Sequence, residues 1–162
     1  MELKFKKLAK EAVMPTYAHA ADAGMDLTAT RFTQEVDKSG KVILVYHTDL
    51  AVEIPEGYFG IICMRSSVCK KSISMCNAVG IIDHGYTGEL IIKFKITTDA
   101  IPTVYQPGEK VAQLIILPKP EIEIVETEEL AESERGDNGF GSSDKKEDND
   151  KQTETKADDR NA

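Results

Sequence analysis

The sequence lacks the positive charge that binding to a nucleic acid polymer needs. Its 162 residues include 20 basic and 28 acidic side chains, a formal net charge of −8, whereas a protein that wraps DNA or RNA requires a basic face. A small phosphorylated ligand is not excluded, because a few arginines, backbone amides and a divalent cation can hold a polyphosphate. The sequence therefore predicts no nucleic acid polymer as a partner.

Marks of export, membrane insertion and a structural metal are also missing. No uncharged run approaches the ~18 residues that a membrane helix needs, and residues 1–7 lack the apolar block of a signal peptide. The cysteines, Cys63, Cys69 and Cys76, are odd in number, and their spacings of six and seven match no zinc pattern. We expect reduced thiols in a soluble protein without membrane contact, located in the cytoplasm, or in the host cytoplasm if the chain is viral.

Two common catalytic arrangements are absent as well. There is no Gly-x-x-x-x-Gly-Lys-Ser/Thr loop for phosphate. The histidines, His19, His47 and His84, are isolated, so neither a zinc site nor a Ser-His-Asp triad is predicted. His84 follows Asp83 directly, but alternation along a strand would turn the two side chains to opposite sides, which disfavours His84 as a general base.

Apolar and polar residues alternate with a period of two along much of the chain. Short strands bounded by turn residues predict an all-β sandwich or barrel. The expected strands cover residues 3–5, 42–46, 50–54, 58–64, 90–96 and 112–117, and a last strand starts with Ile122 and Ile124. Helices are expected only at residues 67–71 and near residues 126–134.

The last segment differs in composition from the rest. Residues 144–162 contain no aromatic or large aliphatic side chain, but five basic and seven acidic ones. Such a segment cannot bury enough apolar surface to order itself, so we expect a disordered tail. The predicted organisation is a β domain at residues 1–134, a glycine-rich motif at 135–143 and this charged tail.

Residues 80–90 combine a carboxylate, an aromatic ring and glycines. Apolar residues lead into Asp83, Gly85 allows a sharp turn, and Tyr86 and Gly88 precede a second apolar run. This order predicts a β-hairpin with Asp83 and Tyr86 at its mouth. Ordinary turns also contain Asp beside Gly, so a turn without catalytic role is the alternative. A carboxylate that takes a proton from water, next to a ring, indicates hydrolysis of a substrate with a planar or ring-shaped part.

Two earlier segments contain side chains suited to a phosphorylated ligand. Asp26 is interpreted either as a turn or edge-strand carboxylate, or as a group that faces a metal's hydration shell or a sugar hydroxyl. Arg65, Ser66 and Ser67 end an apolar strand. Ser66 is expected to cap a short helix, and that helix start, a hydroxyl and the guanidinium are expected to converge on phosphate oxygens. Helix capping by Ser66 and phosphate binding by residues 65–67 can hold together, because a capped helix start is itself an anion site.

Two later segments complete the set. Gln113 lies in an apolar strand and needs a polar partner, either in the core or on a ligand. Residues 135–143 contain three glycines, Arg135, Phe140 and two serines. They are interpreted either as a linker or as a flap, in which amides and Arg135 hold phosphate while Phe140 stacks on a base.

In this order and spacing, the five segments resemble the five motifs of the homotrimeric dUTPase family, from about Met1 to Ser143. The order of all five is far more specific than any single motif. The resemblance implies a β-clip or distorted jelly-roll subunit in a threefold trimer, with each site drawn from all three chains. It also implies hydrolysis of dUTP to dUMP and pyrophosphate, which limits uracil incorporation into DNA and supplies dUMP for dTMP synthesis.

The resemblance further implies roles for individual residues. Asp83 resembles the base that orients the attacking water, and Tyr86 resembles the ring under the deoxyribose, which leaves no room for a 2′-hydroxyl. Asp26 resembles the residue that touches water on Mg²⁺, the implied cofactor, which the three phosphates hold with few or no direct protein ligands. The implied contacts are Asn77, Gly80 and Ile82 for uracil, Arg65, Ser66, Ser67 and Gln113 for phosphate, and Arg135, Phe140, Gly141, Ser142 and Ser143 for the flap of another subunit.

The sequence departs from the family pattern in three places. Met64 stands where the family often has Pro, Asp137-Asn138 makes the last motif more polar, and Asp144 stands where a further Gly is common. Two alternative functions remain. A dCTP deaminase shares the fold, but Lys93 occupies the position where such deaminases have Glu. A regulatory binding module would use the motifs to sense a ligand and the tail to bind a partner.

Overall fold

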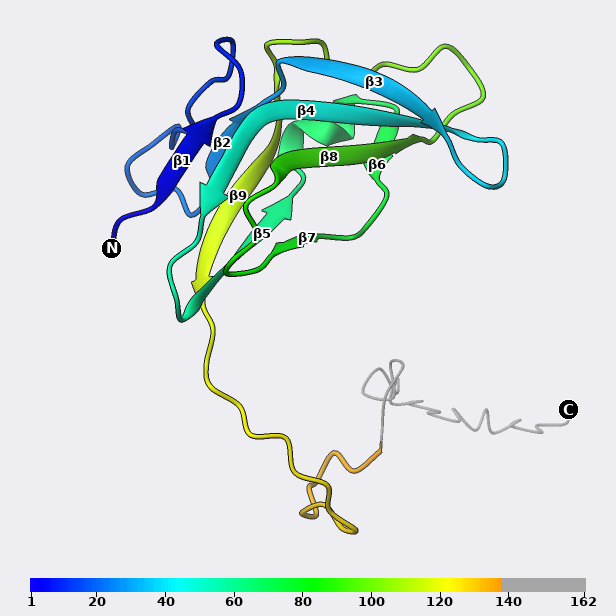
Figure 1. Cartoon of the computed structure of the whole chain (residues 1–162). Coiled ribbons are helices and arrows are strands. Elements are labelled where there is room, and N and C mark those ends of the chain that lie inside the picture. The colour runs from blue at the N-terminus through cyan, green and yellow to red at the C-terminus, as the bar shows by residue number, and fades with distance from the viewer. Residues whose placement is uncertain (138–162) are drawn as a thin grey trace, which may run out of the picture. The chain divides into compact units, whose positions relative to one another are not determined.

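The computed structural model of the chain describes residues 1–137 (Figure 1). The chain divides into two units, Met1–Ile122 and Glu123–Ala162, and the nine strands of the described residues all lie in the first. The predicted all-β fold is confirmed. Across residues 1–137, no helix is both long and apolar enough to cross a membrane.

Antiparallel strands form two sheets. The first consists of β1 (Lys4–Lys7), β3 (Arg31–Val36), β4 (Val42–Glu53), β6 (Ile73–Met75) and β8 (Glu89–Ile96), in the order β1-β4-β8-β6 with β3 also on β4. The second consists of β2 (Met25–Thr28), β5 (Tyr58–Cys63), β7 (Gly80–Ile82) and β9 (Lys110–Pro118), in the order β2-β9-β5-β7. A short 3₁₀ helix, η1 (Ser66–Lys70), follows β5.

The core lies between the facing sides of the sheets. Along β8, Leu90, Ile92 and Phe94 are buried and alternate with exposed residues, as a period of two predicts. Phe94 packs edge-on against Tyr46 of β4, with ring centroids 5.5 Å apart. The Tyr46 hydroxyl donates a 3.0 Å hydrogen bond to the Tyr105 carbonyl, and burial raises the pKa of Tyr46 to about 12.

The two strands expected at 42–46 and 50–54 are one continuous strand, β4. Asp49 has a positive φ of 52°, and the pairing of β4 with β8 shifts between His47 and Ala51. The Asp49 amide donates a 2.9 Å hydrogen bond to the Glu89 side chain. A β-bulge between His47 and Ala51 therefore accommodates the shift in pairing, and β4 continues beyond it to Glu53.

The hairpin predicted at residues 80–90 is wrong. β7 pairs with β5 in the second sheet, whereas β8 pairs with β4 and β6 in the first. Residues 83–88 therefore cross from one sheet to the other. Two strands joined by a short connection do not have to pair with each other. Which strands pair depends on long-range packing, and a turn between two apolar runs does not reveal it.

Three smaller expectations also need correction. The expected helix forms as η1, but Arg65 occupies its N-cap and no side chain caps it, so the prediction that Ser66 is the cap is wrong. Neither the strand expected at Ile122 nor the helix expected near 126–134 is present in the described residues. The Ile124 side chain is 94% exposed, and no strand of the described residues pairs with this segment to complete its backbone hydrogen bonds.

Candidate active site

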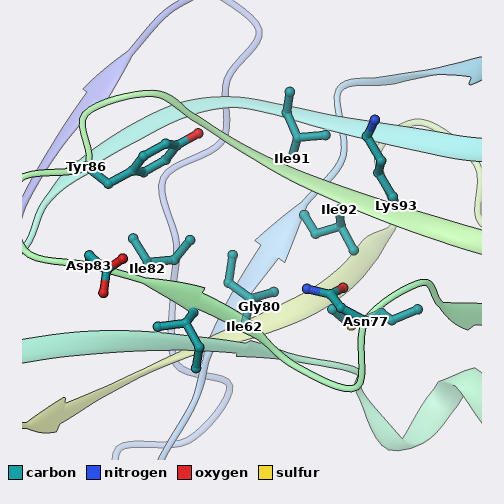
Figure 2. A pocket seen from close by; sticks show the side chains of 11 residues that line it. Ile62, Asn77, Gly80, Ile82, Asp83, Tyr86, Ile91, Ile92 and Lys93 are labelled. Atoms are coloured by element: carbon teal, nitrogen blue, oxygen red, sulfur yellow. The ribbon is translucent and has the colours of Figure 1, made fainter.

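A hollow of about 300 Å³ lies where the crossing at residues 83–88 joins β7 to β8. We call it the Tyr86 hollow. Its lining residues are Ile62, Met75, Asn77, Gly80, Ile81, Ile82, Asp83, Tyr86, Ile91, Ile92 and Lys93. Figure 2 shows Asp83 and Tyr86 at one end and Asn77 and Lys93 at the other. The structure thus brings together the acid, the ring and the three residues expected to contact uracil.

The turn that presents Asp83 and Tyr86 is held by its backbone. The Tyr86 amide donates a 3.1 Å hydrogen bond to the Asp83 carbonyl, and Gly85 adopts a φ of +88° that an L side chain rarely adopts. The Tyr86 hydroxyl donates a 3.0 Å bond to the Glu89 carbonyl. Gly88 lies against the ring, and a Cβ there would be 2.5 Å from the hydroxyl. The ring is therefore confined, while its 45% exposure leaves surface for a ligand.

Asn77 and His84 differ in how they lie relative to this hollow. The Asn77 side-chain amide donates a 2.8 Å bond to the Val79 carbonyl, which fixes the turn entering β7. His84 Nδ1 lies 2.6 Å from the Ile54 carbonyl, to which it donates, and His84 does not line the hollow. His84 therefore does not share the hollow with Asp83, but the expected strand alternation is not the reason, because both residues lie in the turn after β7.

A second hollow, of about 310 Å³, gathers segments from three parts of the sequence. We call it the Gln113 hollow. Its lining residues are Ala18, Asp22, Ala23, Gly24, Asp26, Arg65, Ser66, Gln113 and Ile115. The central position of β9 explains the assembly, because Gln113 is opposite Asp26 of β2 on one side and Cys63 of β5 on the other. Arg65 and Ser66 follow β5 after Met64, at the start of η1.

Asp26 is buried and faces two cations. Its Oδ1 accepts a 2.7 Å hydrogen bond from Arg65 Nε. Lys110 Nζ lies 2.7 Å from Oδ2 at an angle outside hydrogen-bond geometry, so this contact is an ion pair only. Removing both cations would leave the buried Asp26 carboxylate uncompensated, whereas Arg65 and Lys110 themselves remain partly exposed to solvent. Asp26 therefore fixes the Arg65 guanidinium at the edge of the hollow.

Gln113 has a partner within the protein. Its Nε2 donates a long, 3.4 Å bond to the Met64 carbonyl. Its Oε1 faces Gly24, where an added Cβ would lie 2.8 Å away. Gln113 therefore has one polar partner inside the protein, as the first interpretation expected. Because its side chain also lines the hollow, the second interpretation, a contact with a ligand, stays a prediction.

Not all expected site residues come together. The Ser67 hydroxyl lies 3.3 Å from the Tyr105 hydroxyl, and Ser67 lines neither hollow. The Tyr86 and Gln113 hollows share no lining residue. Arg135 belongs to the second unit of the chain. Phe140, Gly141, Ser142 and Ser143 lie outside the described residues.

The family model for dUTPase matches residues 10–144. The chain belongs to the dUTPase family. Curated relatives include the deoxyuridine 5′-triphosphate nucleotidohydrolases of Hydrogenobaculum sp. (strain Y04AAS1), 35% identical, and Clostridium tetani, 38% identical. Each match covers 88% of this chain and 97% of the relative.

Solved structures of dUTPases are similar to this chain as well. The Staphylococcus bacteriophage 80alpha dUTPase with dUPNHPP has a TM-score of 0.72 at 32% identity, covering 87% of this chain and 97% of that one. A mutant dUTPase of phage phi11 of S. aureus has a TM-score of 0.67 at 28% identity, covering 82% and 100%. For that mutant, the coordination of a structural Mg(II) ion is described.

The donor set of this dUTPase-family chain limits how a metal can bind. No group of three or more His, Cys, Asp or Glu side chains is placed to hold a metal within residues 1–137. In the Gln113 hollow, both Asp26 oxygens face cations, and Asp22 Oδ2 accepts a 2.8 Å bond from the His19 amide. Within residues 1–137, these engaged carboxylates provide no set of direct ligands for a metal, so a cation at this hollow would have to be held mainly by a ligand.

Sequence reasoning missed two contributors to the site. Lys110 was not singled out, although it opens the strand that contains Gln113, and its charge next to an apolar run was the available signal. Glu89 was missed because its role depends on its backbone carbonyl, which accepts the Tyr86 hydroxyl. Side-chain chemistry in the sequence contains no signal for such a contact.

Proposed function

We propose that this chain hydrolyses dUTP to dUMP and pyrophosphate. The observation that supports it most is the Tyr86 hollow, in which Asp83, Tyr86 and Asn77 line one surface in a chain of the dUTPase family. The relatives named above are nucleotidohydrolases of deoxyuridine triphosphate. The activity would limit uracil incorporation into DNA and supply dUMP for dTMP synthesis.

Asp83 is the proposed general base. Its exposed carboxylate orients water and accepts a proton as the water attacks the α-phosphorus. A positioned carboxylate typically contributes ~10²–10⁴-fold. Arg65, held by Asp26, stabilises negative charge on the phosphates, with Ser66 and Gln113 as hydrogen-bonding groups beside it. Magnesium, held by the phosphates, would supply further neutralisation of charge when bound.

Selectivity in this proposal depends on the Tyr86 hollow. The confined Tyr86 ring lies under the deoxyribose, so a ribose 2′-hydroxyl has no room. Asn77 and the backbone of Gly80 and Ile82 contact uracil. Cytosine exchanges a donor for an acceptor, and a mismatch that leaves buried groups unpaired costs ~10⁴–10⁵ in selectivity. Thymine is rejected by the size of its methyl group.

A complete site in this proposal needs three subunits of a homotrimer. The separation of the Tyr86 and Gln113 hollows supports this, because base-binding and phosphate-binding residues of one chain line different surfaces. A second chain would provide the Gln113 hollow. A third chain would provide residues 135–143 as a flap. In the sequence, this flap follows the β domain at 1–134 and precedes the tail at 144–162.

Mixed trimers test this shared arrangement. Asp83→Asn and Arg65→Gln variants should each be inactive alone. After joint unfolding and refolding, about a quarter of the sites would combine an intact Asp83 with an intact Arg65 from different chains. Recovery of activity supports the arrangement. Absence of recovery in trimers shown to be mixed would mean that both residues act from one chain.

The activity itself is tested by pyrophosphate release with Mg²⁺ from dUTP, UTP, dCTP and dTTP. Release from dUTP alone supports the proposal, and equal release from all four contradicts it. Ammonia release from dCTP would instead support the deaminase alternative. The contact of Lys93 Nζ with Glu35, at 2.6 Å, argues against that alternative, because a paired cation stands where a catalytic Glu is needed.

A further inference from the structure

A third hollow, of about 490 Å³, lies between η1 and the start of β9. We call it the Lys70 hollow. Basic side chains dominate its lining, which includes Arg65, Ser67, Lys70, Lys71, Glu109 and Lys110. Lys70, Lys71 and Glu109 take no part in the proposed reaction. The hollow therefore needs an explanation of its own.

The local charge is opposite in sign to that of the whole chain. Four cations line the hollow, against Glu109 in the lining and Asp26 next to it, which leaves a local charge of +2 in a chain of net charge −8. A basic hollow of this kind concentrates small anions, although the protein as a whole repels them.

The acidic groups near the hollow are already engaged. Glu109 accepts a hydrogen bond from the Gln106 amide. It also accepts hydrogen bonds from Lys71 Nζ, which lies 3.2 Å from Oε1 and 3.3 Å from Oε2. The Gln106 amide and the Lys71 ammonium lower the pKa of Glu109, so it stays ionised and paired. Asp26 is paired with Arg65 and Lys110. Lys70 is exposed and, within residues 1–137, has no ion pair, so its ammonium is available to an anion.

Arg65 joins this hollow to the proposed reaction site. It lines both the Lys70 hollow and the Gln113 hollow. Its Nη1 lies 3.4 Å from the Ser67 hydroxyl, which is itself 3.3 Å from the Tyr105 hydroxyl. The Arg65 guanidinium and the Ser67 hydroxyl thus line the same hollow as Lys70, while Tyr105, which is 2% exposed, lies beneath them. Such donors suit phosphate oxygens.

We propose that the Lys70 hollow binds a phosphate-type anion, and that its occupant is the pyrophosphate released next to it. This assignment of the occupant rests on the proposed function. Binding of the anion is independent of turnover, because the hollow is formed by one chain and needs no nucleotide. Pyrophosphate leaving the Gln113 hollow would move along Arg65 and Ser67 to Lys70.

Calorimetry with inorganic pyrophosphate, on the full-length assembled protein without nucleotide, tests the proposal. Lys70→Gln should weaken pyrophosphate binding roughly five- to tenfold, since an exposed charged hydrogen bond is lost. Lys70→Arg should retain it. Lys38→Gln is the matched control, because Lys38 is an exposed lysine on the β3–β4 turn that lines none of the hollows, and it should leave binding unchanged.

Product inhibition gives a second readout. Lys70→Gln should raise the inhibition constant of pyrophosphate more than the KM of dUTP. Equal weakening by Lys70→Gln and Lys38→Gln, or no pyrophosphate binding by the unsubstituted protein, would overturn the proposal. A KM that rises in step with the inhibition constant would assign Lys70 to the substrate site instead. Pyrophosphate binding by a protein that does not hydrolyse dUTP would leave the site standing and refute only the proposed function.

Discussion

Replacing Gly88 by alanine tests whether the position of the Tyr86 ring determines selectivity. The added Cβ would lie 2.5 Å from the Tyr86 hydroxyl and 2.7 Å from ring atom Cζ, where ordinary contact begins at 3.4 Å. The ring must therefore retreat by roughly 1 Å, and the hydroxyl would lose its bond to the Glu89 carbonyl. A misplacement of about 1 Å can cost ~10²-fold in rate.

The assay compares kcat/KM for dUTP and for UTP. Gly88→Ala should lower kcat/KM for dUTP by roughly 30- to 100-fold. The ratio of dUTP to UTP should fall as well, because a displaced ring no longer fills the space of the 2′-hydroxyl. The loss is expected in activity and selectivity rather than in folding stability, since the crossing at residues 83–88 is largely exposed and little core packing changes.

Gly40→Ala is the control for a loss of stability away from Tyr86, since Gly88 itself has no positive φ and its alanine variant acts through the ring contact. Gly40 has a φ of +84° with nothing within 4 Å of an added Cβ, so the variant adds only a strain of about 1 kcal/mol in the β3–β4 turn. It should lower the melting temperature without changing kcat/KM. If Gly88→Ala kept the dUTP to UTP ratio of the unsubstituted protein, confinement of Tyr86 would not be the source of selectivity.

Three further predictions concern the base, the core and the C-terminal segment. Asp83→Asn should lower kcat by ~10²–10⁴-fold while calorimetry shows nucleotide binding retained; near-normal turnover would rule out Asp83 as the base. Tyr46→Phe should cost about 1–2 kcal/mol of unfolding free energy, because the Tyr105 carbonyl loses its buried donor. The raised pKa of Tyr46 stabilises the fold fully below pH 10, and this contribution disappears as pH rises from 10 to about 12; Tyr46→Phe should lack that alkaline loss in denaturant titrations. Deleting residues 144–162 should leave pyrophosphate release intact, whereas ending the chain before Arg135 should abolish it, and equal rates for the two truncations would contradict the flap.

Much of the fold could be predicted because its signals are local. The alternation of Leu90, Ile92 and Phe94 with exposed neighbours follows from the period of a strand, and the structure has β8 there. The same holds for β5 and β9, which lie close to the expected ranges. The bulge at Asp49 was missed, because it depends on contacts with Glu89 across the sheet.

The candidate site was predictable in chemistry but only partly in geometry. Asp83 and Tyr86 share a hollow, as their spacing in the sequence suggested, and Asn77 lies in the same hollow, as the resemblance to the family implied. Asp26 was expected near metal-bound water, and the structure adds its ion pairs with Arg65 and Lys110. These ion pairs join three segments that are far apart in the sequence, so no local pattern could predict them.

The sequence by itself determined the all-β class, the order of the five motifs and the side chains available for phosphate and base contacts. It could do so because strand periodicity and side-chain chemistry are properties of residues close together in the chain. Only the tertiary structure decided that β7 and β8 belong to different sheets, that the motifs divide between two hollows, and that Arg65 borders a third. Those features depend on which strands pack side by side, and that choice is made by contacts between residues distant in sequence.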